Sequence, residues 1–225
     1  ENEVKIDAAE QFFAALASLG HGGALFSFFK TADHIAFEIV GKPGDIRFYV
    51  SVHDHLRDLV EKQIYGMYPG AEIKEVDEYN IFDEKGKVAF ASFILKSPDF
   101  YPLKSFKDLP VDPLSSITSA LSKMQTGEGA VIQILISPSS DKWKKKGKSH
   151  IAGIKKNEAN PEKAHYNVDP KVLEQVENKT SKPGFATVIR VVVSSTSLES
   201  ARMHLHNLET AFAQFSSNQN HLGRA

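Results

Sequence analysis

The 225-residue chain contains no cysteine, which excludes disulfides and thiolate metal sites. No apolar run approaches the roughly 18–20 residues that a membrane helix needs, and no secretory signal peptide is recognisable. An excess of one charge is also lacking, because 27 Lys and Arg balance 28 Asp and Glu. The chain as a whole is therefore not committed to nucleic acid or to an acidic membrane. Its 41% hydrophobic residues suffice for one large or two small folded domains.

Catalytic motifs are missing as well. There is no Gly-x-Ser-x-Gly elbow, no His-Glu-x-x-His, and no carboxylate pair that stands out as a general acid and base. The stretch Gly147–Ser149 matches the tail of a phosphate loop, but Lys142 stands where that motif needs its first glycine. The sequence therefore predicts no catalytic residue and no cofactor in this chain.

The spacing of residues also argues against two further kinds of site, a histidine metal site and an aromatic RNA-binding strand. Two pairs of histidines are spaced by two residues, His53/His55 and His204/His206. Inside helices this spacing turns the side chains about 200° apart, so we expect surface histidines and no metal site. The stretch Lys85–Phe93 is similar to an aromatic RNA-binding strand, but Phe90 and Phe93 are an odd number apart and would face opposite sides.

The strongest pattern is an internal repeat. Residues Ile46–Pro69 and Ile189–Phe215 both begin with Ile-Arg, continue as a Val- and Ser-containing strand and turn into an amphipathic helix. Each copy follows a Lys-Pro-Gly, at Lys42–Gly44 and Lys182–Gly184. We predict a unit of helix, strand, strand and helix used twice. The expected fold class is α+β, ferredoxin-like, with antiparallel sheet covered by helices on one face.

This repeat divides the chain into a first half at 1–110 and a second half at 111–225, with an insertion at 138–184. Outside the two repeat copies the sequence predicts these elements: helices from Asp7 to Gly20, from Asp112 and from Asp169; strands at His34–Val40, Ala71–Val76, Val88–Lys96 and Ala130–Ile136; and a loop at 21–23 followed by an apolar run at Phe26–Phe29. The first of these helices is expected to bury Phe12, Phe13 and Leu16.

The insertion concentrates positive charge. Residues 139–184 hold 11 Lys against 6 Asp and Glu, whereas the remainder holds 16 basic against 22 acidic residues. The candidate contact residues for nucleic acid or lipid are Lys142, Trp143, Lys144, Lys145, Lys146, Lys148, Lys155 and Lys156. Lysines around one aromatic ring suit a nucleic-acid backbone or an anionic lipid. The alternative is a solvated loop or helix end with Trp143 packed on the domain.

Arg47 and Arg190 occupy matching places in the two copies. They are either a pair of functional cations or outward-facing strand residues that each pair with a carboxylate across the strand. The second interpretation is favoured.

Several stretches carry a family resemblance: AAEQFFAAL, IRFYVSV, QIYGMYPGAEI, DPLSSITSALSK and KPGFATVIRVVVSS. Together they resemble the N-terminal domain, of unassigned function, of bacterial type IV secretion and conjugative-transfer ATPases of the HerA–FtsK type. The resemblance runs from about Ala8 to Phe215. It implies a module that lies between an N-terminal membrane segment and a C-terminal motor, at the inner face of the bacterial membrane.

The same resemblance implies that the phosphate loop, the magnesium-binding strand and any arginine finger lie beyond Ala225. Because the chain begins with Glu1 and not Met, we expect a segment of a longer protein. The leading hypothesis is a non-catalytic docking module whose partners are its own ATPase domain, other secretion subunits or further copies of itself. The alternative is a nucleic-acid-binding module that uses the Lys-rich insertion, and a third hypothesis is a small stand-alone enzyme.

Overall fold

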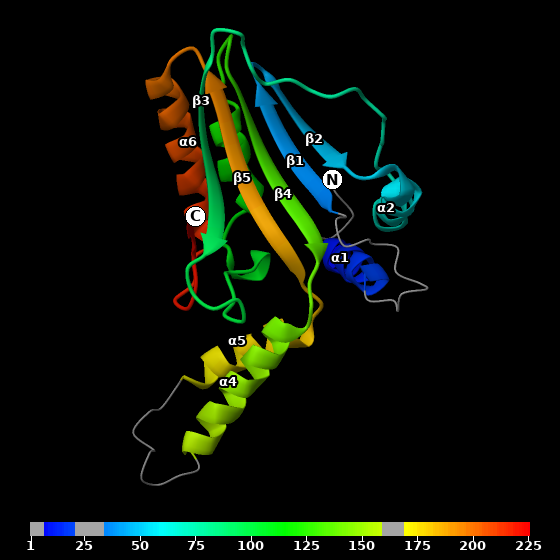
Figure 1. Ribbon diagram of the computed structural model, residues 1–225, viewed down its shortest axis with the longest axis vertical. Coiled ribbons are helices and arrows are strands. Elements are labelled where there is room, and N and C mark those ends of the chain that lie inside the picture. Colours follow the sequence, from blue (N-terminus) through cyan, green and yellow to red (C-terminus); the bar gives the residue numbers. More distant parts are fainter. Residues whose placement is uncertain (1–6, 21–33, 159–168) are drawn as a thin grey trace.

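A computed structural model describes residues 7–20, 34–158 and 169–225. Six antiparallel strands form one sheet in the order β2-β1-β4-β5-β3-β6 (Figure 1). The strands are β1 (Ile35–Lys42), β2 (Asp45–Ser51), β3 (Lys87–Leu95), β4 (Gly129–Pro138), β5 (Phe185–Ser195) and β6 (Leu222–Arg224). The helices are α1 (Asp7–Gly20), α2 (Asp54–Met67), α3 (Pro113–Leu121), α4 (Lys142–Glu158), α5 (Pro170–Ser181) and α6 (Leu198–Phe212), with short 3₁₀ turns at Phe106–Asp108 and Ala213–Phe215.

The predicted α+β class and the antiparallel sheet with its helical cover are confirmed. The unit of helix, strand, strand and helix occurs as α1-β1-β2-α2 and again as α3-β4-β5-α6, with α4 and α5 inserted between β4 and β5. The two halves share the sheet, because β1 pairs with β4 and β3 pairs with β5.

The repeat is built locally by turn and cap residues. Pro43 and Gly44 form a two-residue turn between β1 and β2, and Gly44 has a φ of 70°, which favours glycine. Asp112 accepts a hydrogen bond from the Leu114 N–H at 2.9 Å and caps α3, as its sequence predicts.

The main core lies between the sheet and the helices α3 and α6. Leu121, Ile132 and Leu208 are fully buried there. At Gly41 on β1 an added Cβ would lie 2.9 Å from the Cβ of Leu121, so only glycine lets α3 approach this strand.

A second core joins α1 and α2 to the ends of β1 and β4. Phe12, Leu16, Leu56 and Val60 are buried in it, which confirms the predicted burial of Phe12 and Leu16 and the predicted amphipathic character of α2. Phe13 departs from its prediction. It is 37% exposed, and its ring packs edge-on against Phe12 with 5.2 Å between the centroids.

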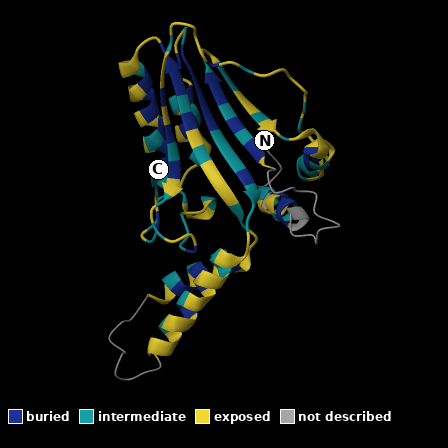
Figure 2. Cartoon of the chain, in the orientation of Figure 1, coloured by how far each residue is buried: buried dark blue, intermediate teal, exposed yellow. Residues whose placement is uncertain are grey.

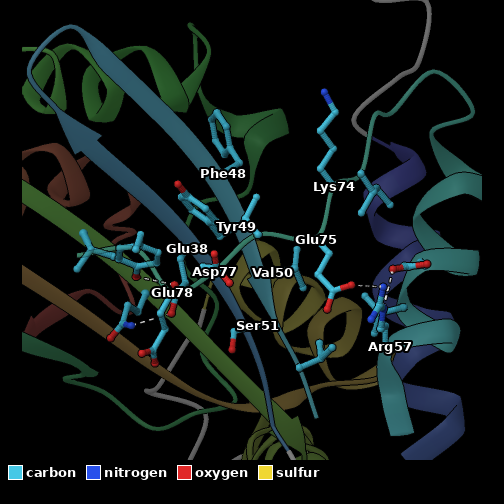
Figure 3. A pocket seen from close by; sticks show the side chains of 18 of the residues that line it. Glu38, Phe48, Tyr49, Val50, Ser51, Arg57, Lys74, Glu75, Asp77 and Glu78 are labelled. Atoms are coloured by element: carbon cyan, nitrogen blue, oxygen red, sulfur yellow. Dashed lines mark hydrogen bonds and ion pairs between the residues drawn. The ribbon is translucent and has the colours of Figure 1, made fainter. Parts of the chain in front are cut away.

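The prediction of a strand at Ala71–Val76 is wrong. Residues 71–82 instead cross from α2 to the sheet without regular structure, and we call them the strap (Figure 3). Tyr79 and Ile81 fasten the strap: Tyr79 donates a 2.6 Å hydrogen bond to Glu38, and Ile81 is buried against Val40. The expected loop at 21–23 and the run Phe26–Phe29 lie outside the described residues.

The face of the sheet opposite α3 and α6 is open over β3 and β5, and exposed residues alternate with buried ones along β3 (Figure 2). Phe90 is 72% exposed on this face, whereas Phe93 is buried against α6. The prediction that these two rings face opposite sides is therefore confirmed.

Candidate functional site

The insertion folds into a helical arm, formed by α4 and α5, that projects from the ends of β4 and β5 (Figure 1). The sequence predicted only the helix that Asp169 caps, and a 17-residue helix also spans most of the lysines. The overlooked signal is the spacing of Trp143, Gly147, Ile151 and Ile154, which places them on one face of a helix.

The arm has a small core of its own. Phe100, Ile151, Leu173 and Val176 are buried together between the two helices and the connector that follows β3. Gly147 sits at the closest approach, because an added Cβ there would lie 2.6 Å from Cγ2 of Thr180. Gly147 is therefore a helix-packing contact, and the stretch Gly147–Ser149 lies within α4 and forms no phosphate loop.

Of the eight candidate residues, five are exposed lysines whose ammonium groups have no ion pair or hydrogen bond to any residue that the structure describes: Lys142, Lys145, Lys146, Lys148 and Lys156. We call these five the lysine stripe. From Lys142 to Lys156 the helix rises about 1.5 Å per residue, so the stripe extends over roughly 20 Å. Several phosphates of an extended polyanion fit along this length.

The other three candidate residues have local roles. Lys144 pairs with Asp141 at 3.0 Å and Lys155 with Glu177 of α5 at 2.8 Å. Trp143 is half-buried and lies against Gly184, where an added Cβ would come within 2.6 Å of its ring. Trp143 is therefore packed on the domain, as in the second of the two interpretations of the sequence.

Comparison with known proteins places the chain in a family. The family model described as a domain of unknown function, DUF8128, matches residues 1–221. The chain belongs to the DUF8128 family. No curated protein and no solved structure matches it.

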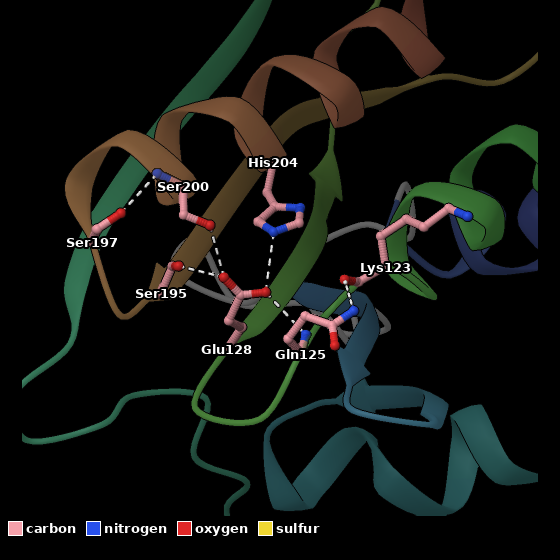
Figure 4. A network of polar contacts seen from close by, with 7 residues as sticks. All are labelled: Lys123, Gln125, Glu128, Ser195, Ser197, Ser200 and His204. Atoms are coloured by element: carbon pink, nitrogen blue, oxygen red, sulfur yellow. Dashed lines mark hydrogen bonds and ion pairs between the residues drawn. The ribbon is translucent and has the colours of Figure 1, made fainter.

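A buried carboxylate network lies at the start of α6, and sequence reasoning missed it (Figure 4). Glu128 accepts hydrogen bonds from the hydroxyls of Ser195 at 2.5 Å and Ser200 at 2.8 Å, and from the Gln125 N–H at 2.9 Å. The two serines share Oε1, and Oε2, which accepts from Gln125, also lies 3.1 Å from Nε2 of His204. His204 is buried, so the expectation of a surface histidine is wrong at this position.

Burial alone raises the pKa of Glu128, but the hydrogen bonds from Ser195, Gln125 and Ser200 outweigh it and lower the pKa to about 2. The DUF8128 domain thus keeps an ionised carboxylate inside its core at neutral pH. Both serine hydroxyls donate to the carboxylate, and neither has a hydrogen bond to His204. In a catalytic triad a His ring stands between the carboxylate and the hydroxyl, but here both hydroxyls bond to the carboxylate directly, so the network is not arranged as a triad. It ties β5 and α6 to the residue that precedes β4.

Among residues 7–20, 34–158 and 169–225, no group of three or more His, Asp or Glu side chains could hold a metal ion. Across the same ranges no helix combines the length and apolar character needed to cross a bilayer.

The two matching arginines of the DUF8128 domain are exposed but do not pair across strands as expected. Arg47 pairs with Asp45 of its own strand at 2.7 Å. Arg190 lies on the open sheet face and has no ion pair with a described residue. Gln133 and Ser92 occupy the cross-strand positions beside Arg190, so no carboxylate stands opposite this arginine.

Proposed function

We propose that this DUF8128 domain is a non-catalytic docking module of a membrane-associated type IV secretion or conjugative DNA-transfer ATPase. The arm is the observation that supports docking. Two helices, packed on each other and on Phe100 of the connector, leave the sheet at one place and return beside it, because Pro138 pairs with Phe185. Such an arm can engage a partner without disturbing the sheet. The family resemblance of the sequence supports the context of a transfer ATPase at the inner face of the membrane.

The arm can be removed by a short turn. Replacing residues 139–184 by Asn-Gly in the full-length native polypeptide would rejoin β4 and β5 as a hairpin. On our proposal, substrate transfer in cells is lost while ATP hydrolysis by the native protein is retained. Unchanged transfer after removal of the arm would contradict the proposal. So would ATP hydrolysis at a motor-like rate by the 225-residue chain alone.

A second candidate function is binding of nucleic acid through the lysine stripe. The specific observation is that its five ammonium groups are exposed and unpaired within the described residues, on a body that is otherwise acidic. Phosphate contacts of this kind release counterions and make affinity strongly dependent on salt. They carry no sequence information, so the binding would be non-specific.

Changing all five stripe lysines to Gln is expected to weaken binding of duplex DNA by about tenfold or more at low salt. The slope of log affinity against log salt should fall by about 0.9 for each phosphate that the variant no longer neutralises. Fluorescence anisotropy with a labelled duplex measures both quantities. The matched control changes five exposed lysines elsewhere to Gln: Lys62, Lys85, Lys87, Lys104 and Lys123. Equal weakening in the two variants, or no binding by the unmodified chain at low salt, would rule out the stripe as the site.

A further inference from the structure

The edge of the sheet at β2 is open. β2 is the last strand on its side, and no backbone hydrogen bond joins it to any described residue other than those of β1. At the opposite edge the last strand, β6, is three residues long and therefore offers few backbone groups for pairing. An exposed edge strand normally carries proline, a bulge or inward charge that prevents pairing with another chain. β2 has a continuous register and no proline, and its Phe48 is 63% exposed.

Hairpin geometry fixes which groups of β2 point outward. The two-residue turn closes on the hydrogen-bonded pair Lys42 and Asp45, and hydrogen-bonded pairs then recur at every second residue. Arg47, Tyr49 and Ser51 therefore bond to β1. Phe48 and Val50 direct their N–H and C=O away from the sheet, where an added strand would meet them.

This edge lines a cavity of about 670 Å³, the cleft enclosed by β2, α2 and the strap (Figure 3). The strap is fixed at two points. Glu75 pairs with Arg57 of α2 at 2.8 Å, and Tyr79 stacks on Tyr49 with 4.8 Å between ring centroids while it bonds to Glu38. Beyond this ring contact, the cavity separates the strap from β2 and leaves space beside the edge of the strand.

The cleft is strongly acidic. Seven carboxylates and two cations line it. Both cations are already neutralised, since Arg57 pairs with Glu61 and Glu75 and Lys74 pairs with Glu72. Among the remaining carboxylates, Asp77 and Glu78 of the strap are exposed, without an ion pair to a described residue. An occupant of this cleft has to bring positive charge.

We propose that β2 is a docking site for an extended, basic peptide segment of a partner protein, which adds to the sheet as an antiparallel seventh strand. Side chains of such a strand alternate in direction. Those opposite Phe48 and Val50 would be apolar and would cover these two exposed side chains. The alternate ones lie on the side of Tyr49, toward the strap, and would be Lys or Arg that pair with Asp77 and Glu78. Self-pairing of two β2 edges is disfavoured because it would bring two acidic clefts together.

The test uses the 225-residue chain and a labelled seven-residue peptide of alternating Lys and Val, as long as β2. We expect it to bind, and the alternating Glu and Val peptide not to bind. N-methylation of the Val nitrogens removes the donors that face β2, so it should abolish binding. N-methylation of the Lys nitrogens, on the far edge, is the matched control and should leave binding intact. A peptide that binds regardless of which nitrogens are methylated would show mere charge attraction and would overturn the proposal.

Variants of the chain separate charge from backbone pairing. The double change Asp77→Asn and Glu78→Gln should lower the affinity for the peptide about fivefold. The control pair, Glu84→Gln with Glu174→Gln, lies outside the cleft and should leave the affinity unchanged. Val50→Pro removes an outward N–H and should abolish binding. Sedimentation tests the competing occupant: a dimer that Val50→Pro disrupts would make β2 a self-interface and overturn the proposal. The result is independent of nucleic-acid binding by the lysine stripe, because changing the five stripe lysines to Gln should leave peptide binding intact.

Discussion

Replacing Glu128 by alanine is expected to lower the free energy of unfolding by about 3–5 kcal/mol. The substitution removes one carboxylate and leaves the hydroxyls of Ser195 and Ser200, the Gln125 N–H and the His204 ring without their acceptor. Each buried donor left unsatisfied costs about 1–3 kcal/mol, and nearby rearrangement recovers part of the total. Urea unfolding at pH 7 measures the change. Glu174→Ala, an exposed carboxylate on α5, is the control and should stay within about 0.5 kcal/mol of the unmodified chain.

The same residue predicts how stability depends on pH. Since folding lowers the pKa of Glu128 from its usual 4.5 to about 2, its contribution is present above pH 4.5 and is lost as pH falls from about 4.5 towards 2. The unmodified chain should therefore lose about 3 kcal/mol more stability across this window than Glu128→Ala loses. Parallel curves of stability against pH for the two proteins would show that Glu128 is not held ionised in the core.

Leu208→Ala is the second large expected effect, a loss of about 2–5 kcal/mol of unfolding free energy. Leu208 is fully buried on α6 and belongs to the core that joins this helix to β3, β4 and β5. Its truncation removes apolar packing and leaves a cavity that the close-packed sheet cannot fill. The comparison is Met203→Ala on the same helix, where the side chain is half exposed and the expected cost is under about 1 kcal/mol. Equal losses at the two positions would contradict the assigned helix face.

The fold could largely be predicted because its signals are local. The Lys-Pro-Gly repeat, the alternation in β1 and β2 and the caps at Asp112 and Asp169 each act within a few residues. The strand predicted at Ala71–Val76 is wrong, because its apolar residues Ile73 and Val76 lie three positions apart and would face opposite sides of a strand. A strand also needs a partner edge, and that information lies in the tertiary arrangement.

The sites could be predicted only in part. Lysine clustering in the insertion is visible in composition, but which lysines are free depends on neighbours such as Asp141 and Glu177. The network around Glu128 joins residues about 70 positions apart, so no spacing rule reveals it. The cleft beside β2 likewise depends on the strap crossing from α2 to Glu38.

The proposal that this domain is a docking module of a larger ATPase is tested most directly by the mass of the native polypeptide. The measurement is intact mass spectrometry of the protein purified from its source cell, with peptide mapping past Ala225. The account predicts a much longer chain whose C-terminal peptides contain a phosphate loop. A native chain that ends near Ala225 would contradict it, and would leave nucleic-acid binding by the lysine stripe as the function to test.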